Sequence, residues 1–130
     1  MNVVRGHHVS FAVRDLGRSR RFYAEALGFR EIPRPELGIP GAWYGVGEVE
    51  VHLIQVPPGF DAGTPPAKLT PLANHAAFQI EDYEAALAAL RAHGLEVLET
   101  NREAGQLWVQ DPDGNVIELI KPRGARAGRA

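Results

Sequence analysis

Three histidines and one glutamate occupy matching positions in two similar halves of the chain, and these residue types can bind a metal ion. The segment that begins at His8 recurs 67 residues later at His75. The segment around His52 recurs 66 residues later around Glu118. Because a duplicated unit buries its apolar face against its copy, matched positions can converge on one point. The pattern therefore predicts a divalent-metal site whose nitrogen and oxygen ligands are His8, His52, His75 and Glu118.

Strand alternation indicates that the four candidate ligands lie on the strand faces that do not pack against the helices. Side chains two residues apart on a strand share a face, so His8 goes with Ser10, and His75 goes with Ala77. The intervening positions form an apolar face suited to helix packing: Val9, Phe11, Val13, Val51, Leu53, Phe78, Ile80, Ile117 and Leu119. Glu118 lies in an apolar run, where a carboxylate needs a cation or several donors to offset its desolvation. The small side chains of Ser10 and Ala77 would leave room for a substrate above the metal.

The elements that carry these residues are expected to form two β-α-β-β-β modules. In the first, alternation predicts strands at about 8–13, 29–34, 43–46 and 50–56. Its helix would begin after the N-cap Asp15 and end at Gly28. In the second, strands are expected at about 75–80, 96–101, 106–110 and 116–121, with a helix between Asp82 and Gly94. The fold class is therefore α+β, with a mixed eight-stranded sheet curved into a cup by its twist.

A chain of 130 residues suits a single domain. We expect the first module at about 6–56 and the second at about 74–122. A proline-rich linker would join them at 57–73, and a disordered tail would occupy 123–130.

Composition excludes several classes of function. A formal net charge of −2 offers no electrostatic attraction for nucleic acid or an anionic membrane. Cysteine is absent, which excludes disulfides and thiolate metal sites. We expect a cytoplasmic protein that acts on a small molecule and contacts neither nucleic acid nor a membrane.

Two motifs resemble one known superfamily. The run from His8 to Phe29 (His-x-Ser-Phe-x-Val-Arg-Asp-Leu-Gly-Arg-Ser-x-Arg-Phe-Tyr-x-x-x-Leu-Gly-Phe) resembles the opening module of the vicinal oxygen chelate superfamily. The run Asp111-Pro-Asp-Gly-Asn-Val-Ile-Glu-Leu119 resembles its closing hairpin. The superfamily includes glyoxalase I, bleomycin-resistance proteins, fosfomycin-resistance proteins and extradiol dioxygenases, and the resemblance is closest to small glyoxalase-like proteins.

The resemblance implies a homodimer of paired modules and a divalent metal that chelates neighbouring substrate oxygens. His8, His75 and Glu118 match the usual set of two histidines and one carboxylate. His52 falls on the variable fourth slot, where glyoxalase I enzymes have a carboxylate. Iron, manganese, nickel, zinc and cobalt all remain candidates for the metal.

The first expectation for the reaction is glyoxalase-type chemistry, a lyase or isomerase step through a metal-stabilised enediolate. Glu118 would act as both ligand and base, or a water would act as the base instead. Ser10, Trp43, Ala77 and Trp108 would line the substrate pocket. Two positions depart from the glutathione-binding pattern of glyoxalase I, with Ala12 in place of an arginine and Val56 in place of an asparagine. These departures favour a different small oxygenated substrate.

Three alternatives remain open. A fosfomycin-type thiol transferase is suggested by Ser10, which lies where those proteins place a substrate-binding threonine, although Glu99 replaces an expected lysine. An extradiol-type dioxygenase would use the same triad of ligands. The non-enzymatic alternative is a resistance protein that binds and sequesters a drug.

Overall fold

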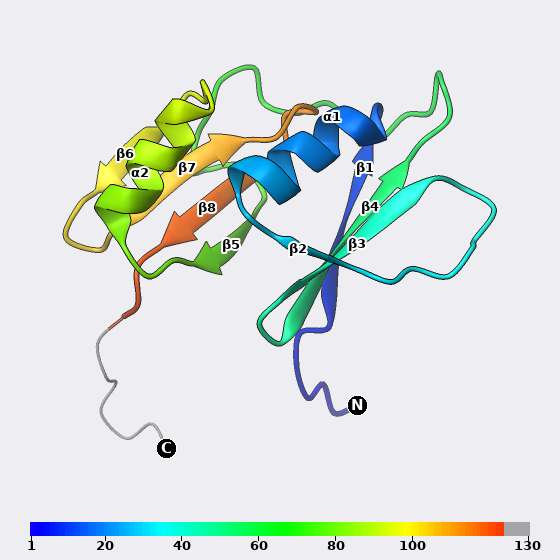
Figure 1. The fold of residues 1–130 in the computed structure, drawn as a ribbon, viewed down its shortest axis with the longest axis horizontal. Coiled ribbons are helices and arrows are strands. Elements are labelled where there is room, and N and C mark those ends of the chain that lie inside the picture. The colour runs from blue at the N-terminus through cyan, green and yellow to red at the C-terminus, as the bar shows by residue number, and fades with distance from the viewer. Residues whose placement is uncertain (124–130) are drawn as a thin grey trace. The chain divides into compact units, whose positions relative to one another are not determined.

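The computed structural model describes residues 1–123, in which the order β-α-β-β-β occurs twice (Figure 1). The first set comprises β1 (His8–Val13), α1 (Leu16–Arg20), η1 (Arg21–Ala26), β2 (Arg30–Ile32), β3 (Gly41–Val46) and β4 (Val49–Gln55). The second comprises β5 (His75–Gln79), α2 (Tyr83–Ala92), β6 (Leu98–Asn101), β7 (Gln106–Gln110) and β8 (Val116–Ile120). The predicted β-α-β-β-β order of elements is therefore confirmed in both halves. Most of the tail predicted at 123–130 lies outside the described residues.

All eight predicted strands are present in the described residues. They form two open sheets of four strands each. Their orders are β1-β4-β3-β2 and β5-β8-β7-β6. In each sheet the first pair, β1 with β4 and β5 with β8, is parallel, and the other pairs are antiparallel. The described residues group into two compact units, the first made of residues 1–65 and 111–115 and the second of 66–110 and 116–123.

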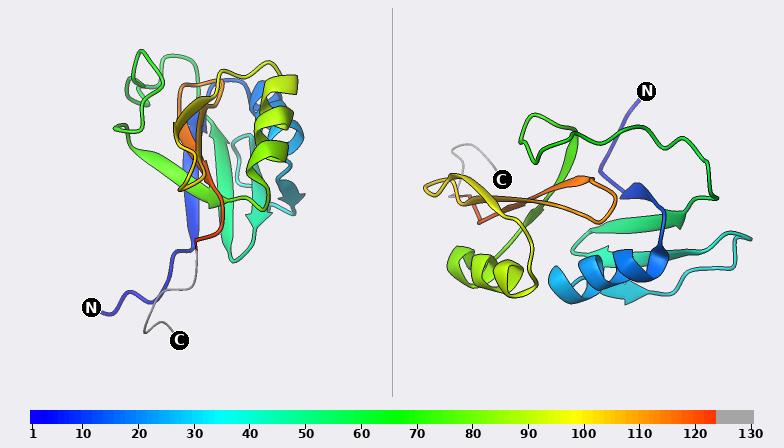
Figure 2. Two further views of the ribbon diagram at one scale, coloured as in Figure 1. Left: turned by 90° about the vertical axis from the view of Figure 1, so that its left-hand side faces the viewer. Right: turned by 90° about the horizontal axis from the view of Figure 1, so that it is seen from above.

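The helices cover one face of each sheet and leave the other face without a helix (Figure 2). In the first unit the covered face is fully buried at Val13, Tyr44, Val51 and Leu53, where these side chains meet the helical segment. The Asp15 side chain accepts a hydrogen bond from the Arg18 amide and so begins the helix as predicted.

The helix predicted between Asp15 and Gly28 changes its hydrogen bonding half-way. After α1 the chain forms the π-helical segment η1, in which the Leu27 amide donates to the Phe22 carbonyl at 3.0 Å. A π-helical turn holds more residues per turn than an α-helical one, which shifts the direction of the side chains that follow. Phe22 and Tyr23, adjacent in sequence, are both buried here. Gly28 then takes a φ of 73°, which ends the helix.

The second unit buries the equivalent face of its own sheet. Leu87 and Leu90 of α2 are buried, as are Leu107 and Val109 of β7 and Ile117 of β8. The Asp82 carboxylate accepts from the Ala85 amide at 3.0 Å and caps α2 as predicted. No helix of the described residues is long and apolar enough to cross a membrane.

The turn at residues 111–115 is organised around a buried carboxylate. Asp111 is 4% exposed and accepts four hydrogen bonds, from the Asp113 and Asn115 amides, the Asn115 side chain and the Tyr23 hydroxyl. Burial raises the pKa of Asp111, although these donors act in the opposite direction. Gly114 takes a φ of 88°, which glycine adopts without strain in a tight turn.

Candidate functional site

The strand register places the candidate residues of each unit on its helix-free face. In the first sheet His8 is the Cα partner of Glu50, and His52 is the partner of both Ser10 and Trp43. In the second sheet Glu118 is the partner of both Ala77 and Trp108. Cα partners on neighbouring strands point to the same face. Trp43 and Trp108 therefore occupy equivalent positions beside the two ligand slots at 52 and 118.

In the first unit His52 lies between two other rings. Its imidazole stacks on His8 with ring centroids 4.1 Å apart and on Trp43 with centroids 4.2 Å apart. Because β4 lies between β1 and β3, these neighbours flank His52 from opposite sides. The stack fixes the orientation of the His52 ring, which is 9% exposed.

Two polar side chains complete this cluster, and neither was predicted to belong to it. The carboxylate of Glu50 lies 2.8 Å from His52 Nε2. His7 Nδ1 lies 2.8 Å from His8 Nδ1, so one of these rings donates to the other. Strand alternation gives no direction for His7, because β1 begins only at His8.

In the second unit the Glu118 carboxylate lies between two nitrogen atoms. His75 Nε2 is 3.4 Å from Glu118 Oε1, and the Gln106 side-chain amide donates to Glu118 Oε2 at 3.0 Å. Glu118 is 7% exposed, so this carboxylate has lost most of its hydration. The Trp108 ring meets His75 edge-on, with centroids 4.8 Å apart, and its indole N–H donates to Thr100.

The hydrogen bonding of His75 determines which of its nitrogen atoms is available. Its Nδ1 lies 2.8 Å from the Ala73 carbonyl oxygen, which can only accept, so Nδ1 carries a proton. In the neutral imidazole Nε2 then presents a lone pair toward Glu118. Two electron-pair donors face each other across 3.4 Å, an arrangement that a cation between them would stabilise. A backbone carbonyl that holds Nδ1 in this way is a common support for a metal-binding histidine.

Each unit thus brings together one pair of the predicted ligands. His8 and His52 are in contact in the first unit, and His75 and Glu118 in the second. Within residues 1–123 no group of three or more His, Asp or Glu side chains is arranged to hold a metal ion. The donors that are present, imidazole nitrogen and carboxylate oxygen, fit a divalent transition metal.

Comparison with known proteins identifies the family of the chain. Residues 5–119 match the sequence model of the glyoxalase/bleomycin resistance protein/dioxygenase superfamily. The chain belongs to this superfamily. It is 34% identical over 121 residues to "Glyoxylase I 4" of Arabidopsis thaliana, covering 87% of this chain and 68% of that protein. It is 32% identical over 133 residues to the lactoylglutathione lyase of Escherichia coli O157:H7, covering 93% and 95% of the two chains.

A solved structure agrees with these relatives. The crystal structure of a putative glyoxalase family protein from Bacillus anthracis superimposes with a TM-score of 0.76 at 27% identity, covering 95% of this chain and 99% of that chain. The predicted superfamily and fold class are therefore confirmed.

Position 52 differs from the pattern expected for glyoxalase I enzymes within this superfamily. Those enzymes are expected to have a carboxylate at the fourth ligand position, whereas this chain has His52. A carboxylate is nevertheless present, because Glu50 lies two residues earlier on the same face and contacts the His52 ring. Alternation along β4 could have identified Glu50, and the pairing of β7 with β8 could have identified Gln106.

Proposed function

We propose that the protein is a divalent-metal-dependent lyase of the glyoxalase type that acts on a small oxygenated substrate. Relatives named lactoylglutathione lyase support the class of reaction. The observation that carries the proposal of a metal is the geometry of His75, whose Nδ1 is bound to a backbone carbonyl while Nε2 faces the buried Glu118 carboxylate.

The proposed ligands are His8, His52, His75 and Glu118. Three imidazoles and one carboxylate suit iron, manganese, nickel, zinc or cobalt rather than calcium or magnesium, which prefer oxygen ligands. When bound, such an ion would supply Lewis-acid stabilisation of the negative charge that develops on a carbonyl oxygen as a neighbouring carbon loses its proton.

Glu118 is the proposed base as well as a ligand. The Gln106 amide holds one carboxylate oxygen at 3.0 Å and so fixes the plane of the carboxylate. The low exposure of Glu118 excludes bulk water, which strengthens its electrostatic interactions with a substrate. Its other oxygen, Oε1, lies on the side of His75, where it would bind the metal, so Oε2 is the atom left to take a proton from the substrate carbon.

The proposed substrate pocket is lined by Ser10, Trp43, Ala77 and Trp108. Each lies directly beside a ligand position in the strand register. The two indole rings offer flat apolar surfaces, and the small side chains of Ser10 and Ala77 leave space above the sheet. We further propose that the protein is a cytoplasmic homodimer. Light scattering after size-exclusion chromatography would test the dimer.

Metal content is the first test. Freshly purified protein should hold a stoichiometric divalent metal, and His75→Ala and Glu118→Gln should each weaken metal affinity more than about tenfold. His93→Ala and Glu96→Gln are matched controls, because both residues are exposed and have no role in the proposed site. Protein that takes up no divalent metal after reloading would refute the proposal.

Turnover then separates the candidate reactions. The loaded protein is incubated with methylglyoxal and a panel of thiols, with fosfomycin and thiols, and with catechols under oxygen. Isomerisation of a hemithioacetal supports the proposal, and Glu118→Gln should abolish it. Activity confined to fosfomycin or to a catechol would instead assign one of the alternative reactions.

A further inference from the structure

A chain of hydrogen bonds in the second unit ends at the Glu118 carboxylate. The Trp108 indole N–H donates to Thr100 Oγ1 at 2.8 Å, and the Thr100 hydroxyl donates to Gln106 Oε1 at 3.4 Å. The Gln106 amide nitrogen donates to Glu118 Oε2 at 3.0 Å. All four residues belong to one unit. Thr100 was not predicted from the sequence to belong to a site, and it has no role in the function proposed above.

The direction of every donor in this chain of hydrogen bonds follows from its two ends. An indole nitrogen can only donate, so the Thr100 oxygen accepts from Trp108 and its own proton is free for a second partner. An ionised carboxylate can only accept, so the Gln106 atom that faces Glu118 is its nitrogen. The Gln106 oxygen therefore lies toward Thr100, where it accepts the hydroxyl proton.

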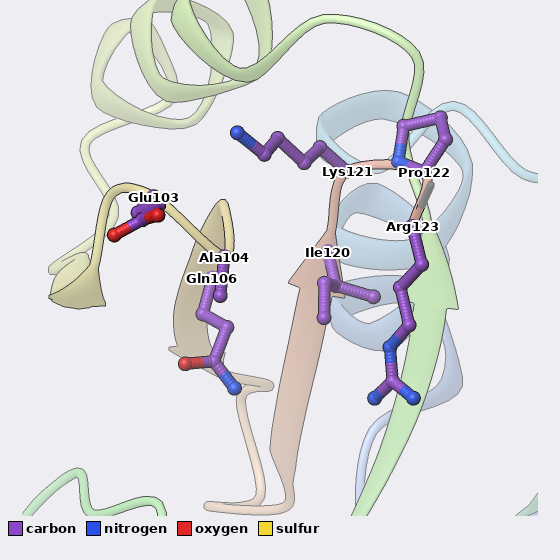
Figure 3. A pocket seen from close by; sticks show the side chains of 7 residues that line it. All are labelled: Glu103, Ala104, Gln106, Ile120, Lys121, Pro122 and Arg123. Atoms are coloured by element: carbon purple, nitrogen blue, oxygen red, sulfur yellow. The ribbon is translucent and has the colours of Figure 1, made fainter. Parts of the chain in front are cut away.

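A reversed Gln106 amide would break this arrangement at two places. Its oxygen would face the Glu118 carboxylate, so two acceptors would meet with no proton between them. Its nitrogen would face Thr100, and the Thr100 proton would lose its acceptor. Glu118 is 7% exposed, so little water is available to compensate. Gln106 also lines the pocket drawn in Figure 3, where its amide nitrogen lies on the side of β8 and its oxygen is turned away from β8.

An irregularity in β6 brings Thr100 within reach of both neighbours. The register between β6 and β7 passes from Glu99 directly to Asn101, which leaves Thr100 as the extra residue of a bulge. Trp108 and Gln106 are two residues apart on β7 and share a face, and the Thr100 hydroxyl contacts both. Bulges often occur beside active sites, where they redirect a side chain.

The first unit has no amide at the equivalent position. In the second sheet Gln106 is paired with the residue of β8 that lies two beyond Glu118. In the first sheet Gly41 is paired with the residue of β4 that lies two beyond His52. The amide donor therefore accompanies the ligand slot that is a carboxylate and is absent where the slot is a histidine. This difference indicates that Gln106 serves Glu118 and not the general packing of a sheet.

We propose that Thr100 is a positioning residue of the reaction, which together with the Trp108 indole holds the Gln106 amide in the orientation that presents an N–H to Glu118. The inference rests on the proposed function, in which Glu118 Oε2 takes the proton of the substrate carbon. A carboxylate oxygen has two lone pairs, so the Gln106 N–H occupies one and leaves the other for that proton. A fixed amide thus sets the direction from which Oε2 accepts a proton, and proton transfer depends on this geometry.

The first test follows the hydrogen bonds in the full chain without added metal, where no turnover is required. The NMR signals of the Gln106 side-chain amide and the Trp108 indole N–H report the links on either side of Thr100. Thr100→Val keeps the branched shape of the side chain but removes its hydroxyl, so it should shift both sets of signals. Thr100→Ser retains the hydroxyl and should leave them close to the parent positions. Thr64→Val is the matched control, because Thr64 is exposed and lies outside this chain of hydrogen bonds.

The second test measures the coupling between Thr100 and Gln106 in the metal-loaded protein, with a hemithioacetal as substrate. Thr100→Val should lower kcat about tenfold and leave KM unchanged, because Thr100 acts through Gln106 and not on the substrate. Thr100→Ser should restore kcat. In a Gln106→Leu background, Thr100→Val should have no further effect, because the residue through which it acts is already absent.

Three results would overturn the positioning role and leave the proposed function standing. They are unchanged Gln106 side-chain signals in Thr100→Val, an undiminished loss of kcat when Thr100→Val is made in the Gln106→Leu background, and an equal effect of Thr64→Val. Shifted Gln106 signals in a protein whose parent form turns over no substrate would instead refute the proposed function, and with it the catalytic purpose of Thr100.

Discussion

Replacing Tyr23 by phenylalanine tests the buried carboxylate that organises the turn at residues 111–115. The Tyr23 hydroxyl donates to Asp111 Oδ2 at 2.7 Å, and the two residues are 0% and 4% exposed. The variant keeps the aromatic ring, which packs against Phe11 and Phe22, and removes a single donor. Water cannot readily replace the lost hydroxyl, because neither partner reaches the surface.

The expected cost follows from the charge of the acceptor. A hydrogen bond to an ionised group contributes about 1.5–3 kcal/mol to stability, and one between neutral groups about 0.5–1.5 kcal/mol. Tyr23→Phe should therefore lower the free energy of unfolding by roughly 1.5–3 kcal/mol at neutral pH. Once Asp111 is protonated, the stability cost of Tyr23→Phe should decrease toward the value for a hydrogen bond between neutral groups, about 0.5–1.5 kcal/mol.

The direction of the pH dependence is fixed by the pKa of Asp111. Burial raises this pKa above its ordinary value, while the Tyr23 hydrogen bond lowers it. Because the folded pKa is raised, the contribution of Asp111 to stability is present at low pH and is lost as the pH rises through that pKa. Without Tyr23 the pKa rises further, so the folded variant takes up its proton at a higher pH than the parent. The stability difference between the two proteins therefore falls on acidification.

Urea denaturation of both proteins from pH 7 downward measures this difference. Tyr44→Phe is the control, since Tyr44 is also 0% exposed but its buried hydroxyl has no hydrogen-bond partner among the described residues. Removal of that hydroxyl should change stability little. The reasoning is refuted if Tyr23→Phe costs no more than Tyr44→Phe at pH 7, or if its cost does not decrease at lower pH.

Three further predictions concern a turn, a helix cap and the proposed metal site. Gly105→Ala should lower the free energy of unfolding by more than about 1 kcal/mol, because Gly105 has a φ of 72° and an added Cβ would overlap the Lys121 side chain. Gly63→Ala is the control in the same urea experiment. Gly63 has a φ of 85° but no atom near an added Cβ, so this variant measures the cost of the backbone conformation alone. Asp82→Ala removes the acceptor of the Ala85 amide and should cost about 1 kcal/mol in urea denaturation, and an unchanged midpoint would contradict the role of this cap. Glu50→Gln should weaken divalent-metal affinity about tenfold in a competition titration with a chelator, whereas the exposed Glu48→Gln should not.

The elements of the fold were predictable because their apolar alternation is strong. β1 and β7 have the bounds that alternation predicted, and both helices begin at the predicted aspartate caps. The faces of the four proposed ligands also follow from alternation, since a shift of one residue would bury His8 and expose Val9. The superfamily was predictable from the opening-module motif of the first half and the closing-hairpin motif of the second half.

Details that depend on packing or on side-chain direction were not predictable. The change from α1 to η1 accompanies burial of both Phe22 and Tyr23, which no local propensity reveals. The contact of Glu50 with His52 requires a particular side-chain rotamer, whereas alternation gives only the face. Gln106 was identified from the sequence only as a strand residue, and its bond to Glu118 depends on the register between β7 and β8.

The duplicated halves have kept equivalent positions while their chemistry has diverged. Each carries a histidine on its first strand and a tryptophan beside the second ligand slot. In the first unit that slot is His52, which is stacked between two rings and contacts Glu50. In the second unit it is Glu118, which is 7% exposed, accepts from the Gln106 amide and faces His75. A carboxylate thus lies beside an imidazole in each half, Glu50 beside His52 in the first and Glu118 beside His75 in the second. We infer that the carboxylate of the first half orients the His52 ring, whereas the carboxylate of the second half is itself the proposed ligand and base.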